Sequence, residues 1–374
     1  MRVGVPTEIK NNEYRVAITA ACVMELTRNG HEVLVESGAG EGSAISDRDY
    51  QSAGASVLNH ASDVWHASDL ILKVKEPVPA EFELMQPGQV LFTYLHLAAD
   101  RDCAVALVES DVTAIAYETV QSDDGALPLL APMSEVAGRL AMQVGAYHLS
   151  RPTGGRGVLL GGVAGVPPAN VVVIGAGVSG LNAVSMAVGM QAAVTVLDLD
   201  LTRLRYVDAM YRGYCRTVAS NAYSIQESVA AADLVVGAVL VPGASAPRLV
   251  DNNLVASMKQ GSVLVDVAID QGGCFADSHP TTHERPTFEV QGSVFYCVAN
   301  MPGAVPFTST YALTNATLPY VLSIANYGWR DAMRRNSALA SGLNTHAGRI
   351  TNREVASSLS MSYESTRQVL SSLQ

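Results

Sequence analysis

The sequence has few cysteines, few charged residues and no long apolar run, and each shortage excludes a class of protein. Its five cysteines are scattered and form no Cys-x-x-Cys pair, so we expect buried thiols in a reducing cytoplasm. No apolar segment reaches the roughly 18 residues of a membrane-spanning helix. The first ten residues include charges at positions 2, 8 and 10 and contain no apolar signal-peptide core, so no signal peptide is expected.

The composition is that of a folded globular protein. Hydrophobic residues make up 48% and charged residues 16% of the 374 positions, which is too apolar for a disordered chain. That length exceeds one hydrophobic core and predicts two domains. The formal net charge of −11 argues against nucleic acid and anionic membranes as partners, whereas a small anionic substrate would respond to local charge.

A glycine-rich turn after a predicted strand is the most informative motif. The apolar run at 171–174 leads directly into Gly175, Gly177 and Gly180, spaced as Gly-x-Gly-x-x-Gly, and then into a helical pattern. Glycine permits the tight turn, lets backbone amides approach a pyrophosphate, and lets the helix pack closely on the strand. The helix N-terminus adds partial positive charge. The motif therefore predicts dinucleotide binding.

An acidic residue closes the next predicted strand, at 193–198. Asp198 would accept a hydrogen bond from a ribose 2′-hydroxyl and repel a 2′-phosphate, which predicts NAD rather than NADP as the cofactor. Arg203 could offset part of that repulsion, although it is more simply interpreted as flanking the adenine or facing solvent.

Alternating apolar runs and helical patterns predict an α/β fold with two Rossmann-like domains, parallel doubly wound sheets and a cleft between them. The strands expected in the first domain are 2–5, 31–36, 70–75, 90–95 and 112–117. Those expected in the second are 170–174, 193–198, 214–218, 233–237, 262–267 and 293–298. Helical patterns cover 19–29, 133–149, 308–335 and 350–373, and no strand is predicted after residue 300. We therefore expect a discontinuous substrate domain, 1–128 with 308–374, around an NAD-binding domain, 129–307.

Four polar residues stand at the carboxyl ends of predicted strands, where open α/β sheets bind ligands. Lys75 and His96 end strands of the first domain, and Asp270 and Asn300 follow strands of the second. Simpler interpretations exist: Lys75 could be solvated, like Lys73 on the same strand face, and His96 could be a partly buried histidine with satisfied hydrogen bonds. Asp270 could cap a helix, and Asn300 could belong to an ordinary turn. Their common placement favours a functional role.

These residue types suit the oxidation of an amino acid at its α-carbon. The substrate carboxylate needs a cation, best an arginine fork or a lysine. Histidine moves protons near neutral pH, and a carboxylate such as Asp270 stabilises a cationic imine. Arg15 is the nearest candidate for the carboxylate clamp, although taken alone it would be interpreted as a surface arginine.

Long contiguous blocks resemble one family, that of alanine dehydrogenase and its relative nicotinamide nucleotide transhydrogenase, over essentially the whole chain. The blocks lie at 1–18, 72–77, 93–98, 116–120, 129–141, 265–274 and 300–319. They are far more specific than the glycine motif.

The resemblance implies an NAD-dependent oxidoreductase that reversibly converts L-alanine and water to pyruvate and ammonium, with glyoxylate reduction or amination left open. It implies that Arg15 and Lys75 bind the substrate, that His96 transfers protons and that Asp270 is the second catalytic residue. It also implies a homohexamer. The residues that it places around NAD are Ser134, Gly175, Ala176, Gly177, Val178, Ser179, Gly180, Asp198, Arg203, Ser220, Val239, Leu240, Val267, Ala268, Ile269, Asp270, Asn300 and Met301.

Some positions depart from the family pattern. Phe307 stands where a basic residue is common, which puts a hinge or subunit contact there in doubt. Ser323 and Tyr327 stand where some relatives have an acid and a histidine, so no metal is predicted. The alternative function is a soluble NAD-binding subunit of a transhydrogenase, which would need no small-substrate pocket. The joint presence of Lys75 and His96 counts against that alternative. A second alternative is a catalytically silent NAD-binding protein.

Overall fold

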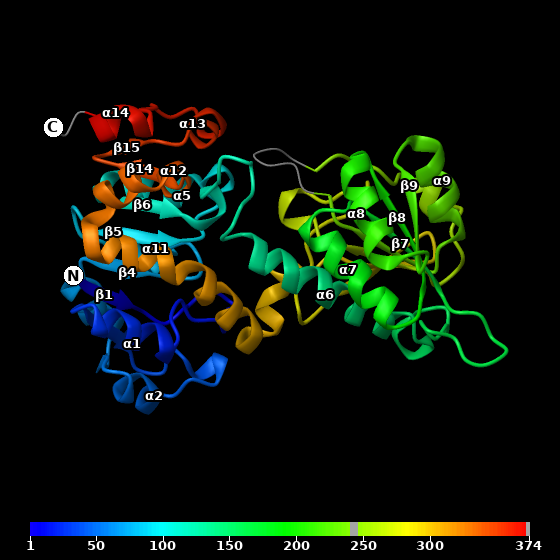
Figure 1. Cartoon of the computed structure of the whole chain (residues 1–374), viewed down its shortest axis with the longest axis horizontal. Coiled ribbons are helices and arrows are strands. Elements are labelled where there is room, and N and C mark those ends of the chain that lie inside the picture. The colour runs from blue at the N-terminus through cyan, green and yellow to red at the C-terminus, as the bar shows by residue number, and fades with distance from the viewer. Residues whose placement is uncertain (240–245, 372–374) are drawn as a thin grey trace. The chain divides into compact units, whose positions relative to one another are not determined.

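The computed structural model describes residues 1–239 and 246–371, which form two compact units (Figure 1). The first unit comprises Met1–Met133 and Val305–Gln374, and the second comprises Ser134–Ala304. The first unit is therefore built from the two ends of the chain, and the second from its middle.

The described part of the first unit contains an eight-stranded sheet, with strands in the order β15-β14-β6-β5-β4-β1-β2-β3. Its strands are β1 (Arg2–Val5), β2 (Glu32–Glu36), β3 (Ser56–Leu58), β4 (Leu70–Leu72), β5 (Val90–Thr93), β6 (Thr113–Ala116), β14 (Leu343–His346) and β15 (Arg349–Ile350). Its helices are α1 (Ala20–Arg28), α2 (Asp47–Ser52), α3 (Ala61–Ala67), α4 (Pro79–Phe82), α5 (Arg101–Glu109), α11 (Pro306–Arg335), α12 (Ser337–Ser341), α13 (Arg353–Leu359) and α14 (Thr366–Ser371). The long helix α11, orange in Figure 1, packs against α1 and so joins the two ends of the chain.

Two expectations for the end of the chain are wrong. β14 and β15 follow residue 300, and β14 pairs antiparallel with β6, so this sheet is not purely parallel. The sequence conceals β14 because two of its buried residues are polar: the Asn344 side chain donates to Thr119 Oγ1 (2.7 Å) and Thr345 Oγ1 donates to the Val112 carbonyl (2.8 Å). The expected helix at 350–373 is instead α13 and α14, because Ser360 adopts a left-handed conformation (φ 53°) that ends α13.

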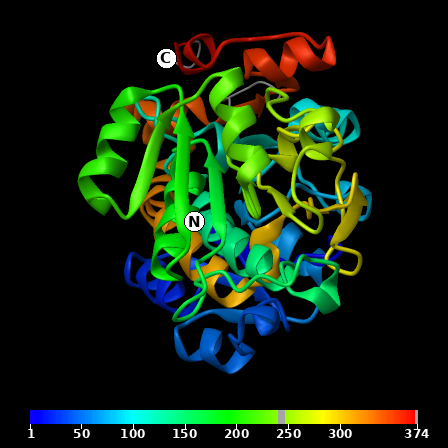
Figure 2. The ribbon, with the colours of Figure 1, turned by 90° about the vertical axis from the view of Figure 1, so that its right-hand side faces the viewer.

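The described residues of the second unit form a seven-stranded sheet in the order β12-β13-β11-β10-β7-β8-β9. Its strands are β7 (Asn170–Ile174), β8 (Ala193–Asp198), β9 (Cys215–Ala219), β10 (Leu234–Gly237), β11 (Val263–Asp266), β12 (Thr287–Val290) and β13 (Ser293–Tyr296). Its helices are α6 (Ala131–His148), α7 (Val178–Gly189), α8 (Leu201–Tyr211), α9 (Ala222–Ala231) and α10 (Asn252–Ala256). The green strands of this unit lie side by side with helices beside them in Figure 2.

The parallel strands of the second unit follow the Rossmann order, with strand order reversing between β7 and β10. The predicted α/β class with Rossmann-like domains is confirmed. β12 departs from this parallel order, since it pairs antiparallel with β13. A buried apolar cluster that includes Val172, Ile174, Ile225 and Val255 packs α9 and α10 onto one face of the sheet. The ends of β7 and β8 are thus fixed by a rigid core.

Two composition-based expectations can be compared with the described residues. All five cysteines are buried and none forms a disulfide, as expected. Within these residues, none of the helices combines the length and apolarity that crossing a bilayer demands.

Candidate active site

Lys75 lies just beyond the carboxyl end of β4, next to the end of β5. Tyr94 donates its backbone N–H to the Val74 carbonyl (3.3 Å), and Thr93 Oγ1 donates to the Lys75 carbonyl (2.9 Å). These bonds hold the segment beside β5 after β4 has ended at Leu72. The predicted strand at 70–75 is therefore shorter than expected, and Lys75 stands in a bend, partly exposed.

Lys73 does not share the environment of Lys75. Its side chain is 1% exposed, and Nζ lies 3.1 Å from Glu8 Oε2 and 2.8 Å from Glu81 Oε1. Burial alone would lower the pKa of Lys73, but the two carboxylates hold it above its ordinary value. The interpretation of Lys73 as a solvated lysine is wrong, because the bend at 74–75 removes the strand alternation on which it depended.

Arg15 is buried, so its interpretation as a surface arginine is wrong. Its Nε donates to Glu13 Oε1 (2.6 Å), its Nη2 to Glu13 Oε2 (2.5 Å) and its Nη1 to Met133 Sδ (3.0 Å). Burial would raise the pKa of Glu13, but hydrogen bonding and charge from Arg15, with a smaller contribution from Lys75, hold it below its ordinary value. Glu13 thus fixes the guanidinium in one orientation and keeps both groups ionised.

His96 occupies a strained backbone position immediately after β5. Its φ is +50°, in the left-handed region, and its backbone N–H donates to Glu118 Oε1 at 2.6 Å. Glu118 also accepts from the Leu95 N–H (3.2 Å), and it lies 4.0 Å from His96 Nδ1. The imidazole is 46% exposed and stacks on the Tyr94 ring, with centroids 6.0 Å apart. His96 is therefore not a core histidine, and its role in proton transfer stays a prediction.

Tyr94 connects the candidate residues of the first unit. Its hydroxyl donates to the Leu129 carbonyl (2.6 Å). Burial raises the pKa of this phenol, and the nearby charge of Arg15 opposes that shift. The charge of Arg15 acts on Tyr94 and that of Lys75 acts on Glu13, while the Tyr94 ring stacks on His96 and the Tyr94 N–H bonds to the Val74 carbonyl beside Lys75, so the three predicted residues share neighbours near the ends of β4 and β5.

The supporting carboxylates were missed by sequence reasoning. Glu118 follows the predicted strand at 112–117, so the rule that selected His96 could have found it. Glu13 lies two residues before Arg15, and opposite charges at that spacing were a usable signal. Glu8 pairs with a residue 65 positions away, and only the pairing of β1 with β4 brings them together.

The glycine loop of the second unit leads into the N-terminus of helix α7, with Gly177 at the N-cap position. Gly175 has φ +101°, and a Cβ there would lie 2.6 Å from the Ala238 carbonyl; a Cβ at Gly180 would collide with the Gly175 carbonyl. Gly177 precedes α7, and a Cβ there would meet only Arg203 Nη1, at 3.8 Å. Among the described residues no side chain caps α7. The first N–H groups of the helix therefore suit an anionic ligand such as a pyrophosphate.

Asp198 stands at the end of β8, beside this loop, and is 9% exposed. Its Oδ2 accepts from the Ala176 N–H (2.6 Å) and its Oδ1 from the Asp200 N–H (2.8 Å). Arg203 Nη1 lies 3.8 Å from Oδ2, and the Ser220 N–H donates to the Asp198 carbonyl (2.9 Å). A carboxylate has about four acceptor sites, so the two backbone bonds orient Asp198 without using its full acceptor capacity.

The other predicted cofactor residues lie on four further segments. Val267 donates its N–H to the Gly237 carbonyl at 2.9 Å, which sets the segment 267–270 beside the end of β10. Asp270 is exposed within the turn Ile269–Gln271 and caps no helix, so that alternative is wrong. Asn300 follows β13 with φ +58°, a conformation that asparagine tolerates. Buried Met301 follows it, Ser134 lies in α6, Val239 follows β10, and Leu240 lies outside the described residues.

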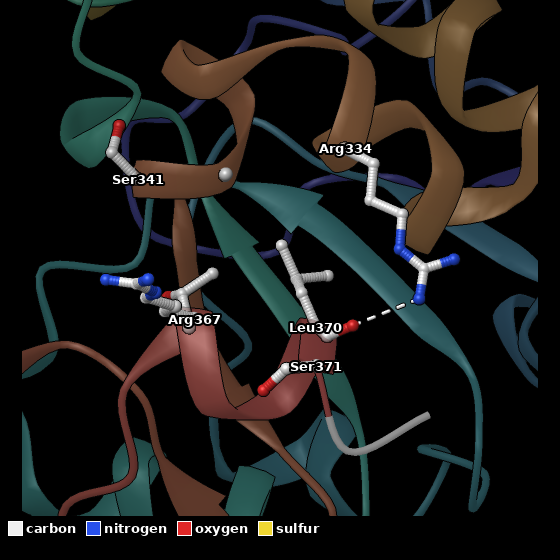
Figure 3. A pocket seen from close by; sticks show the side chains of 7 residues that line it. Arg334, Ser341, Arg367, Leu370 and Ser371 are labelled. Carbon is white, nitrogen blue, oxygen red and sulfur yellow. Dashed lines mark hydrogen bonds between the residues drawn. The ribbon is translucent and has the colours of Figure 1, made fainter. Parts of the chain in front are cut away.

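A hollow of about 610 Å³ lies elsewhere in the first unit (Figure 3). It is lined by Arg334, Ala340, Ser341, Thr366, Arg367, Leu370 and Ser371. Arg334 is engaged there, since Nη2 donates to the Leu370 carbonyl (3.0 Å) and Nη1 pairs with Asp331. None of the predicted site residues lines this hollow. The described part of the chain also holds no group of three or more His, Cys, Asp or Glu side chains that could bind a metal.

Comparison with known proteins gives the same match along almost the whole chain. Residues 4–137 match the family model described as alanine dehydrogenase/PNT, N-terminal domain, and residues 141–353 match its C-terminal counterpart. An alanine dehydrogenase of Mycobacterium tuberculosis is 62% identical over 370 residues, 99% of this chain and 100% of that protein.

Two solved structures resemble the fold over nearly its full length. A structure titled L-alanine dehydrogenase is 51% identical, with a TM-score of 0.93, and the match covers 96% of this chain and 99% of that one. A transhydrogenase from Sinorhizobium meliloti is 27% identical, with a TM-score of 0.80, covering 94% and 99%.

Proposed function

Because the chain belongs to the alanine dehydrogenase/PNT family, we propose that it catalyses the reversible, NAD-dependent oxidative deamination of L-alanine to pyruvate and ammonium. The observation that carries this activity is the 62% identity to an alanine dehydrogenase over 99% of the chain. The cluster of Arg15, Lys75 and His96 supports it, since a hydride-transfer subunit without a small substrate needs neither two cations nor a histidine there.

The residues of the second unit fit a nicotinamide dinucleotide, which would accept the hydride released from the α-carbon of the substrate. The open N-terminus of α7 and the loop from Gly175 to Gly180 would hold its pyrophosphate. Asp198 would accept from the 2′-hydroxyl of the adenosine ribose, with Arg203 and Ser220 beside it. The segment Val267–Asp270, together with Ser134, Val239, Leu240, Asn300 and Met301, is proposed to complete the cofactor contacts.

In the first unit, Arg15 and Lys75 would bind the carboxylate and carbonyl of pyruvate, or the carboxylate of alanine. Glu13 holds the guanidinium in place before substrate arrives, which lowers the cost of ordering it. The neutral His96 ring would accept the proton of the water that adds to the imine, and its protonated form would donate that proton in the reverse direction. Asp270 is proposed as the second catalytic residue, which stabilises the positive charge of the imine.

Turnover tests this function directly. Alanine should drive NADH formation from NAD, and pyruvate with ammonium should drive NADH oxidation. Hydride exchange between NADH and an NAD analogue, independent of alanine, would instead support a transhydrogenase subunit. The absence of both reactions would support a catalytically silent NAD-binding protein.

Asp198 is expected to set the preference for NAD. Asp198→Gly should lower the ratio of kcat/KM for NADH to kcat/KM for NADPH by about 10- to 100-fold. The change removes both the charged hydrogen bond to the ribose 2′-hydroxyl and the charge that repels a 2′-phosphate. The ratio is the useful measurement, since the same change also releases the Ala176 N–H and should weaken both cofactors.

Asp200→Ala is the matched control for Asp198→Gly. It removes an exposed acidic charge 3.7 Å from the same Arg203, and it should leave the NADH to NADPH ratio unchanged. Equal activity of the unaltered protein with both cofactors would contradict the assignment of Asp198.

We further propose that the protein is a cytoplasmic homohexamer. Five buried, unpaired thiols suit a reducing compartment. Phe307, where a basic residue is common in the family, forms an exposed aromatic pair with Tyr311 on α11, with centroids 4.9 Å apart, so any subunit contact at this position would be apolar instead of charged. Light scattering should return six times the chain mass of 39.3 kDa, and a smaller particle would contradict the hexamer.

A further inference from the structure

A buried ionic cluster contacts the backbone of the bend that carries Lys75. Glu8 follows β1, Lys73 follows β4 and Glu81 lies in α4, and their side chains are 3%, 1% and 4% exposed. The Lys73 ammonium stands between the two carboxylates. With both carboxylates ionised the cluster carries one surplus negative charge. Buried ion pairs are costly to desolvate and are weak evidence for stability, so a purely stabilising role does not explain the arrangement.

The two carboxylates bond to different parts of the backbone. Glu8 Oε1 accepts from the Val74 N–H (2.5 Å) and lies 3.4 Å from the Lys75 N–H, while its Oε2 faces Lys73. Glu81 Oε2 instead accepts from the Val78 N–H (3.0 Å), at the start of α4. Of the two carboxylates, Glu8 is therefore the one that hydrogen-bonds to the bend that carries Lys75.

We propose that Glu8 is a positioning residue for Lys75, holding the bend at 74–75 in the conformation that presents the Lys75 ammonium to the substrate. The proposal rests on the proposed role of Lys75 in substrate binding. Lys73 contributes by holding Glu8 Oε2, so that Oε1 stays aimed at the two backbone N–H groups. The effect on substrate is indirect, since Glu8 itself is buried.

Both oxygens of Glu8 are needed because its hydrogen-bond partners, the Lys73 ammonium and the Val74 and Lys75 N–H groups, are all donors. A carboxamide offers one acceptor and one donor group. In Glu8→Gln the side-chain NH₂ must face either the Lys73 ammonium or the Val74 N–H, and each arrangement sets two donors against each other. The side chain keeps its shape but loses a hydrogen bond, either to the Val74 N–H or to the Lys73 ammonium.

A second substitution can restore the pattern of donors and acceptors. In Glu8→Gln with Lys73→Gln, the residue 8 carbonyl can accept from the bend and its NH₂ can donate to the residue 73 carbonyl. The residue 73 NH₂ can then donate to Glu81. The double variant also keeps the net charge of −1 that the unaltered cluster has.

The experiment measures KM for pyruvate in reductive amination and, by fluorescence titration, Kd for NADH. Glu8→Gln should raise KM for pyruvate by about 10- to 100-fold, the equivalent of one charged hydrogen bond, with Kd for NADH unchanged. The double variant should return KM to within about threefold of the unaltered protein. Glu81→Gln is the matched control: it makes the same charge change against the same ammonium and should leave KM within about threefold.

An unchanged KM in Glu8→Gln, or an equal rise in Glu81→Gln, would overturn the proposal. If Glu8→Gln does not fold, Glu8→Asp replaces it, because aspartate keeps the charge but is one methylene too short to reach both the bend and Lys73. A rise in KM for Glu8→Asp but not for Glu81→Asp supports the proposal, and equal values overturn it. Lys75→Ala tells a failure of the Glu8 hypothesis from a failure of the proposed role of Lys75. If Lys75→Ala binds pyruvate as well as the unaltered protein does, Lys75 does not bind the substrate.

Discussion

Replacing His96 with alanine is expected to lower turnover in both directions by about 10²–10⁴-fold, the usual contribution of a positioned general acid–base. The ring is exposed and makes one stacking contact with Tyr94, so its loss should not unfold the protein. Both directions should slow together, because the same ring accepts the proton in deamination and returns it in reductive amination. Steady-state rates in each direction give the result.

His96→Asn is the control that separates proton transfer from backbone geometry. The backbone at this position has φ +50°, and asparagine, like histidine, adopts that conformation more readily than alanine does. Asparagine cannot transfer protons near neutral pH, so His96→Asn should be as inactive as His96→Ala. Near-normal rates in either variant would show that the ring does not carry the chemistry.

The rule that placed His96 and Lys75 at one sheet edge uses only local sequence. Each strand is a short apolar run, and the carboxyl ends of parallel strands meet at one edge of the sheet. The same reasoning made Lys73 an equivalent of Lys75. The structure separates them because the chain bends at 74–75 and because Glu8 and Glu81 surround one lysine only. Those contacts depend on which strands pair, and residue spacing along one strand carries no information about that.

The missed strand β14 has a similar cause. Its buried Asn344 and Thr345 break the apolar alternation by which strands are predicted, and their polar atoms are satisfied by Thr119 and Val112, more than 200 residues earlier. The glycine loop could be predicted because its requirements are local: a positive φ at Gly175 and a close backbone contact at Gly180 exclude other residues. Sequence reasoning succeeded where one segment sets its own geometry.

Replacing Lys75 with alanine is expected to abolish useful turnover and to leave NADH binding unchanged. Removing one partner of a buried charge pair typically costs about 2–5 kcal/mol, and the substrate carboxylate or carbonyl would lose that partner. Lys75 belongs to the first unit, whereas the glycine loop and Asp198 belong to the second. Fluorescence titration with NADH should therefore give the Kd of the unaltered protein while pyruvate turnover falls.

Lys10→Ala shows whether the effect of Lys75→Ala is specific or reflects a general loss of positive charge. Lys10 is half-exposed and pairs with Glu76, the residue next to Lys75, so its removal takes one cation from the same segment. It should change KM for pyruvate far less than Lys75→Ala does, because Lys10 is not proposed to contact the substrate, although the nearly buried Glu76 carboxylate loses this partner. A drop in NADH affinity in Lys75→Ala would instead assign this lysine to the cofactor site. Arg15 would then be the remaining proposed cation for the substrate, and its Nε and Nη2 already donate to Glu13.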